Sequence, residues 1–169
     1  MGFDQIDFEI LRELQNNARI SNKELAEKNG IAPSTCLERV RKLKDEGVIQ
    51  HFRAHVSAQA LGVGVQAMIF IRLQKHSKND FEGLCKEISE IEEVINVYLL
   101  AGAIDLLVHV AVRDVDHLRN VVMHTFSARY DPAHMETSII FQIEHSHELP
   151  IYRAADSKHQ TEKNTSKSA

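Results

Sequence analysis

The chain has 169 residues, 43% of them hydrophobic and 26% charged, which is the composition of a globular protein rather than of a disordered or fibrous one. No apolar run approaches the roughly 20 residues that a membrane-spanning helix needs, and the acidic N-terminus does not resemble a signal peptide. Two cysteines, Cys36 and Cys85, make neither a disulfide framework nor a zinc knuckle. We therefore expect a cytoplasmic protein with reduced thiols.

The net charge of −4 does not suggest a nucleic-acid binder, but the charge is unevenly distributed. Residues 1–56 carry nine basic and nine acidic side chains, whereas residues 57–152 carry seven and thirteen. Four cations gather within six residues that contain no acid: Arg39, Arg41, Lys42 and Lys44. An acidic protein with one short basic stripe can still bind DNA through that stripe.

The first 56 residues predict three helices. Asp4 can cap the first helix, and Ser21 with Glu24 forms a capping box at the start of the second. Gly30 is placed to end the second helix, and Pro33 suits the first turn of a third helix over residues 33–46. Two helices joined by a very short turn predict a helix-turn-helix.

The third helix would bury one stripe and expose the other side to DNA. Cys36, Val40 and Leu43 have the spacing of a buried stripe. Six residues of the opposite arc are the predicted DNA-binding residues: Ser34, Thr35, Glu38, Arg39, Arg41 and Lys42. Short polar groups and arginine can read base edges, while cations neutralise phosphates. The alternative is a helix face that is merely solvated.

The second half predicts a β-α-β-β-α-β order, which is the ferredoxin-like arrangement. Alternating apolar residues predict strands from Ala67 and from Met135, and two apolar runs flank a hairpin at Gly102. Apolar residues at helical spacing predict one helix from Phe81 onward and another after Asp114, which can cap it. The strand over residues 65–74 is apolar on both faces, which predicts dimerisation of this domain.

The hairpin is a candidate binding site for a small molecule. Gly102 allows close approach of a ligand, and Asp105, the only ionisable residue in an apolar run, could receive an ammonium group. Alternatively, Asp105 is a turn residue that accepts hydrogen bonds from neighbouring backbone amides. The predicted effector-binding residues are Leu100, Ala101, Gly102, Ala103 and Asp105.

The sequence contains no pattern typical of an enzyme or of a metal site. The pairs His51/His55 and His145/His147 lack a Cys or carboxylate at a spacing usual for zinc. Phosphate-binding glycine loops and nucleophile motifs are absent from the sequence. We expect no cofactor, no metal and no catalytic residue.

The segment IDFEILRELQNNARISNKELAEKNGIAPSTCLERVRKLKDEGVIQ resembles the N-terminal domain of the Lrp/AsnC family, and AGAIDLLVHVAV resembles that family's C-terminal effector domain. The resemblance covers residues 4–147. It implies an α+β protein in which a winged helix-turn-helix precedes a ferredoxin-like effector and oligomerisation domain. It also implies a regulator of transcription that binds double-stranded DNA, forms homodimers that assemble into tetramers or octamers, and responds to an amino acid bound between dimers.

Two positions depart from the family's pattern. Ala32 stands before the proline where the family usually has Ser, and Thr35 with Glu38 could form a later capping box instead. The hairpin keeps Gly102 and Asp105 of a Gly-Asp-x-Asp-Tyr motif but has Ala103 and Leu106 at the other two positions. We therefore expect an altered or weaker amino-acid selectivity.

The expected domain organisation has four parts. A helix-turn-helix domain (1–56) is followed by a linker (57–64), the effector and oligomerisation domain (65–147) and a C-terminal segment (148–169), disordered from about residue 158. The expected function is sequence-specific regulation of transcription, modulated by an amino acid or related metabolite. The alternative is a small-molecule-binding regulatory or interaction module without a physiological DNA site.

Overall fold

The computed structural model describes residues 2–74, 81–130, 132–144 and 148–152 of the chain. These residues form two compact units, each with its own hydrophobic core. The first contains the described residues up to Ala54 together with residues 148–152, and the second spans His55–Glu144. Within the described part of the chain, no helix is long and apolar enough to cross a membrane. The expected disorder beyond residue 158 lies outside the described residues.

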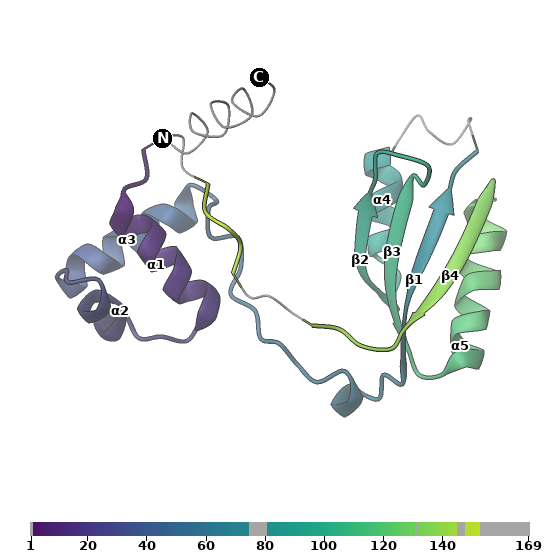
Figure 1. Ribbon diagram of the computed structural model, residues 1–169, viewed down its shortest axis with the longest axis horizontal. Helices are drawn as coiled ribbons and strands as arrows, with labels where there is room; N and C mark the ends of the chain where they lie inside the picture. The colour runs from purple at the N-terminus through teal and green to yellow at the C-terminus, as the bar shows by residue number, and fades with distance from the viewer. Residues whose placement is uncertain (1, 75–80, 131, 145–147, 153–169) are drawn as a thin grey trace, which may run out of the picture. The chain divides into compact units, whose positions relative to one another are not determined.

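The first unit contains the three predicted helices, α1 (Gln5–Asn16), α2 (Asn22–Lys28) and α3 (Pro33–Asp45) (Figure 1). Both predicted caps are confirmed. Asp4 caps α1 in a reciprocal box with Asp7, and Ser21 caps α2 in a box with Glu24. Because each box satisfies backbone amides at a helix start, these ends are determined by local sequence.

The start of α3 differs in one detail from the sequence analysis. Pro33 does occupy the first turn, but the N-cap residue is Ala32, which makes no side-chain cap hydrogen bond. The predicted compensating box of Thr35 and Glu38 is therefore wrong, since the helix begins two residues before Thr35. Proline lacks an amide hydrogen at a position where it would have no partner, so α3 can begin without a capping oxygen.

The second unit is a four-stranded antiparallel sheet with the order β2-β3-β1-β4. The strands are β1 (Val65–Arg72), β2 (Val94–Leu99), β3 (Leu106–Val112) and β4 (His134–Ile140), and Figure 1 shows them side by side in this order. Two helical segments join them: α4 (Phe81–Ser89), and α5 (Val115–Asn120), which continues as the π-helical η3 (Val121–Ser127) and the short α6 (Ala128–Tyr130). This order confirms the ferredoxin-like prediction.

One face of the sheet is buried beneath the helices. Alternate residues of β1 and β3, such as Ile69 and Val108, are fully buried in one cluster with Ile88 of α4 and Phe126 of η3. Among the described residues of the second unit, no helix covers the opposite face. It carries half-buried apolar side chains, among them Met68, Phe70 and Leu107, because successive strand residues point to opposite faces.

The residues before β1 connect the two units. Residues 48–56, all of which are described, form neither helix nor strand, and the short helix η1 (Gln59–Leu61) follows. Gly64 then donates its amide hydrogen to the Val112 carbonyl, 3.0 Å away. A Cβ at Gly64 would lie 2.2 Å from the Arg113 carbonyl oxygen, so the chain passes here only without a side chain.

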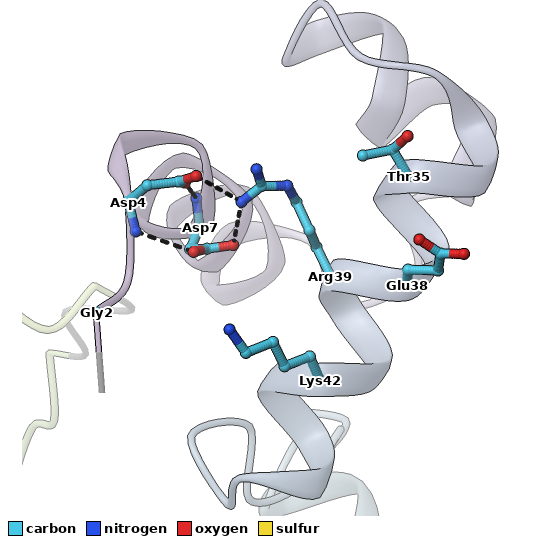
Figure 2. Close-up of a pocket in the computed structure, with 7 residues that line it drawn as sticks. All are labelled: Gly2, Asp4, Asp7, Thr35, Glu38, Arg39 and Lys42. Carbon is cyan, nitrogen blue, oxygen red and sulfur yellow. Dashed lines mark hydrogen bonds and ion pairs between the residues drawn. The ribbon is translucent and has the colours of Figure 1, made fainter.

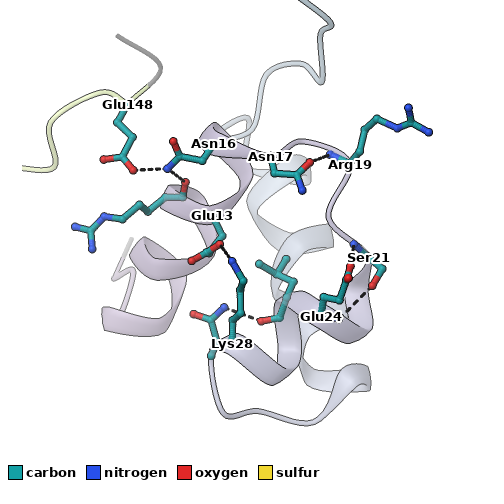
Figure 3. Close-up of polar contacts among 11 residues, drawn as sticks. Glu13, Asn16, Asn17, Arg19, Ser21, Glu24, Lys28 and Glu148 are labelled. Atoms are coloured by element: carbon teal, nitrogen blue, oxygen red, sulfur yellow. Dashed lines mark hydrogen bonds and ion pairs between the residues drawn. The ribbon is translucent and has the colours of Figure 1, made fainter.

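After β4 the described chain returns to the first unit. The backbone amide of Leu149 donates to Oε1 of Gln15 over 2.8 Å, and the Asn16 side chain donates to Glu148 (Figure 3). Residues 148–152 therefore belong to the unit that contains α1, although more than 90 residues lie between Ala54 and residue 148 in the sequence. No pattern in the sequence indicates this contact.

Candidate nucleic-acid interface and effector loop

Helix α3 carries the predicted DNA-binding residues, and most of them are exposed. Cys36 and Leu43 are buried against α1 and α2, with Val40 packed beside them. The opposite side of the helix exposes five of the six predicted residues: Ser34, Thr35, Glu38, Arg41 and Lys42. Figure 2 shows Thr35, Glu38 and Lys42 projecting from the same side of α3. This face therefore combines two cations with three hydrogen-bonding side chains.

Arg39 does not lie on this exposed arc, and that part of the sequence analysis was wrong. Its side chain is 27% exposed and turns toward the start of α1, where Nη1 lies 2.8 Å from Oδ2 of Asp4 and 2.8 Å from Oδ1 of Asp7 (Figure 2). The position of Arg39 on the helix lies next to the buried stripe, so its side chain meets α1 instead of solvent. The two ion pairs join α3 to the N-terminus of α1.

The carboxylates of this cluster each serve two purposes. Asp4 accepts from the Asp7 amide through Oδ1, and Asp7 accepts from the Asp4 amide through Oδ2, both over 3.0 Å, which leaves their other oxygens for Arg39. The hydrogen bond from the Asp7 amide, aided by Arg39, lowers the pKa of Asp4 below its ordinary value. The same carboxylates raise the pKa of Arg39, with Asp7 contributing most. The ion pairs and the capping hydrogen bonds therefore favour the charged forms of Asp4 and Arg39.

A cleft of about 370 Å³ lies between the N-terminus of α1 and α3 (Figure 2). Seven residues line it: Gly2, Asp4, Asp7, Thr35, Glu38, Arg39 and Lys42. Three of these are acidic and two are basic, so the cleft has a formal charge of −1. It is a polar hollow beside the exposed side of α3, and its formal charge does not favour an anion.

The turn between α2 and α3 is held by specific hydrogen bonds. The side chain of Asn22 donates to the Pro33 carbonyl over 2.7 Å, and the Ile31 amide donates to the Ala26 carbonyl over 3.0 Å. Gly30 adopts a φ of 63°, as expected for the left-handed residue that ends α2. Lys28 also pairs with Glu13 of α1 over 2.6 Å (Figure 3). These contacts give the helix pair a defined geometry.

The candidate effector loop connects β2 to β3. Leu100, Ala101, Gly102 and Ala103 are exposed, and Gly102 has a φ of 152° that L-residues rarely adopt. Asp105 is half-buried, and its Oδ2 accepts from the amide of Leu73, the residue that follows β1, over 2.9 Å. This is the turn role that the sequence analysis gave as the alternative to ammonium binding. The structure thus brings all five predicted effector residues together in one loop, with Asp105 tied to β1.

Sequence reasoning missed three contributors to this architecture: Asp7, Asn22 and the Leu73 amide. Asp7 is 6% exposed, and an acid at a position facing the core could have indicated a buried ion pair. Asn22 and Leu73 gave no such signal, since their partners depend on the packing of the folded chain. Among the described residues, no group of three or more His, Cys, Asp or Glu could hold a metal ion. His145 and His147 lie outside the described residues.

Each of the two units matches a known protein domain. Residues 3–50 match the model of a winged helix-turn-helix DNA-binding domain, and residues 66–148 match that of the Lrp/AsnC ligand-binding domain. The chain is 43% identical to the HTH-type transcriptional regulator AldR of Mycolicibacterium smegmatis, over 82% of this chain and 81% of that protein. It is 35% identical to the leucine-responsive regulatory protein of Haemophilus influenzae, over 72% and 73%.

Solved structures show the same fold. The crystal structure of MtbAldR matches with a TM-score of 0.71 and 36% identity, covering 88% of this chain and all of that one. The complex of transcriptional regulator NMB0573 with L-Met from Neisseria meningitidis matches with a TM-score of 0.79 and 28% identity, covering 88% and 97%. With a helix-turn-helix that exposes a polar and basic face, and a ligand-binding unit behind it in sequence, this chain belongs to the Lrp/AsnC family of DNA-binding transcriptional regulators.

Proposed function

We propose that this regulator reads duplex DNA through α3 as a homo-oligomer, and that an amino acid bound at residues 100–105 changes its affinity for DNA. The exposed side of α3 carries this proposal, because it combines Arg41 and Lys42 with Ser34, Thr35 and Glu38 on a helix fixed by its neighbours. In helix-turn-helix proteins the start of the second helix enters the major groove.

The exposed residues have different roles in this proposal. Ser34 and Thr35, in the first turn of α3, are placed to contact base edges, while Arg41 and Lys42 lie one to two turns farther along and can reach phosphates. Arg39 shares its Nη1 between two carboxylates and fixes the position of α3. DNA contact by its remaining guanidinium nitrogens would be an addition to that structural role.

The effector loop has the chemistry to bind a zwitterion. Asp105 supplies an anion for an ammonium group, the turn offers backbone amides for a carboxylate, and Leu100 with Ala101 and Ala103 gives apolar walls. The related regulator NMB0573 has been solved with L-Met, which supports an amino acid as the class of ligand. Ala103 and Leu106 replace a carboxylate and a tyrosine of the family's motif, so we expect selectivity to differ from that of leucine-responsive relatives.

The open face of the sheet supports self-association. Met68 and Phe70 of β1 lie beside Leu107 of β3 on the face that the helices leave open, and Tyr98 of β2 is 45% exposed there. An apolar sheet face of this kind is usually covered. A second copy of the chain would cover it and present two recognition helices to half-sites about 10–10.5 bp, or a multiple, apart. Further association to tetramers or octamers would bring effector loops together.

We further infer a cytoplasmic, non-catalytic protein, in keeping with the named regulators among its relatives. Selection of bound fragments from a genomic DNA pool, with and without each amino acid, tests the proposal. We expect enriched palindromic sites and a change in enrichment with at least one amino acid. Failure to enrich any sequence would support the alternative of a metabolite-binding module. Light scattering that gives a monomer at micromolar concentration would contradict the assembly.

A further inference from the structure

The residue at the centre of the exposed side of α3 is an acid, Glu38. It lies one turn after Thr35 and one turn before Lys42 on the same side of the helix (Figure 2). A carboxylate at the surface that approaches DNA is repelled by phosphates, unless it accepts a hydrogen bond from a base. The position of Glu38 therefore needs a reason other than general attraction to DNA.

The fold does not supply that reason. Glu38 is exposed and takes no part in capping α3, because the N-cap residue is Ala32. Its neighbours of opposite charge are engaged elsewhere or point away: Arg39 pairs with Asp4 and Asp7, and Lys42 lies 4.0 Å from Glu46. Within the described part of the chain, Glu38 has no hydrogen-bond or ion-pair partner.

The surroundings of Glu38 favour a donor group over a phosphate. The adjoining cleft holds three carboxylates and two cations, and one of these cations, Arg39, is held by two of the carboxylates. In the major groove the exposed donors are the N4 amino group of cytosine and the N6 amino group of adenine. Adenine places the acceptor N7 beside N6, which repels a carboxylate, whereas cytosine has no acceptor beside N4.

We infer that Glu38 determines sequence specificity by accepting a hydrogen bond from the N4 amino group of a cytosine in each half-site. This inference rests on the proposed docking of α3 in the major groove. Arg39, locked onto α1, sets the angle of the helix, and Thr35 and Lys42 flank the contact. Glu38 then acts in base readout, whereas Arg41 and Lys42 supply attraction that is independent of sequence.

Selection from random duplex DNA tests this with the full-length wild type, Glu38→Gln, Glu38→Ala and the control Asp45→Asn. Asp45 is an exposed acid at the far end of the same helix, so its neutralisation changes the net charge equally. The wild type and Asp45→Asn should share one consensus with a fixed cytosine. Glu38→Ala should lose about 10-fold of the discrimination at that position alone, and Glu38→Gln should shift it toward adenine.

The outcomes separate this inference from the proposed function. If the wild type enriches no sequence, DNA reading by α3 fails as a whole. If the wild type enriches a consensus that Glu38→Ala and Glu38→Gln leave unchanged at every position, the assignment of Glu38 is wrong while DNA binding stands. A uniform loss of affinity in Glu38→Ala without a change in base preference would equally overturn it, because that result indicates a structural role.

Discussion

Arg39 of α3 and Asp7 of α1 form an ion pair across 2.8 Å, and the Asp7 side chain is 9% exposed. The other oxygen of Asp7 accepts from the Asp4 amide, so a single side chain caps α1 and holds α3. The position of α3 thus depends on Asp7, a residue for which we propose no contact with DNA. Because of this ion pair, we expect Arg39 to hold α3 in place and Arg41 to contact DNA.

We expect a double-mutant cycle of Arg39→Ala and Asp7→Ala to give a coupling of about 1 kcal/mol in the free energy of unfolding, because the pair is partly shielded from solvent. Denaturant unfolding of the four proteins measures it. The pair Lys42–Glu46 serves as the control, since its atoms lie 4.0 Å apart and the lysine side chain is 58% exposed. A coupling for Arg39 and Asp7 no larger than that of the control would contradict the clamp.

Replacement of both Arg41 and Lys42 by alanine should lower the slope of log K against log salt by roughly 2 units, because each phosphate contact releases about one counterion. Titration of an operator fragment at several salt concentrations measures the slope. Arg39→Ala is the informative comparison. Arg39→Ala should weaken DNA binding because α3 is no longer held against α1, and it should change the slope of log K against log salt much less than the double variant does. An unchanged slope in the folded double variant would exclude these residues as phosphate ligands.

Gly64→Ala should destabilise the second unit by about 1–3 kcal/mol, since its Cβ would lie 2.2 Å from the Arg113 carbonyl oxygen and backbone must move to admit it. Chemical unfolding followed by circular dichroism measures the loss. Gly2→Ala is the matched control, because nothing lies within 4 Å of the added Cβ. Equal stability of both variants would show that the segment at Gly64 can shift without cost.

Asp105→Asn separates the two roles of the effector loop. Its amide oxygen can still accept from the Leu73 amide, but the negative charge offered to an ammonium group is lost. Calorimetry across the twenty amino acids should identify a ligand for the wild type and at least a 10-fold weaker binding for Asp105→Asn, with unchanged thermal stability. Wild-type affinity in Asp105→Asn would leave Asp105 with the turn role alone.

The first unit should lose stability in acid. The pKa of Asp4 is lowered below its ordinary value of 3.8 by the Asp7 amide and by Arg39, and that of Glu24 below 4.5 by Ser21. Each carboxylate therefore stabilises the fold above its ordinary pKa, and the contribution disappears as the pH falls through the lowered value. Thermal unfolding from pH 7 to pH 3 should show this loss. Asp4→Asn keeps an N-cap acceptor and should flatten the profile.

Local sequence predicted the parts of the fold that local interactions determine. The cap at Asp4, the capping box at Ser21, the proline that begins α3 and the order of helices and strands along the chain needed only neighbouring residues and alternation. The alternation of apolar residues did not indicate where β4 ends, because Phe141 continues it but lies beyond the last strand residue, Ile140, and is 99% exposed. The π-helical turn of η3 likewise gave no signal in the spacing of apolar residues.

In the candidate sites too, the sequence identified features that depend on local spacing and missed those that depend on distant contacts. Helical spacing identified Ser34, Thr35 and Glu38 as exposed residues, because they lie opposite the buried stripe. It misplaced Arg39, whose position borders that stripe, since the partner Asp7 lies 32 residues away in sequence. Asp105 was recognised as significant, but its tie to the Leu73 amide depends on how β1 ends beside the hairpin. Contacts between distant segments required the folded chain.

Residues 148–152 return to α1, so the second unit, which contains the effector loop, is inserted in sequence within the first unit. A chimaera that joins this effector unit to another helix-turn-helix therefore needs two splice points, one on each side of it. A single cut after Ala54 would leave the Gln15 side chain without the Leu149 amide that it accepts from and Asn16 without Glu148.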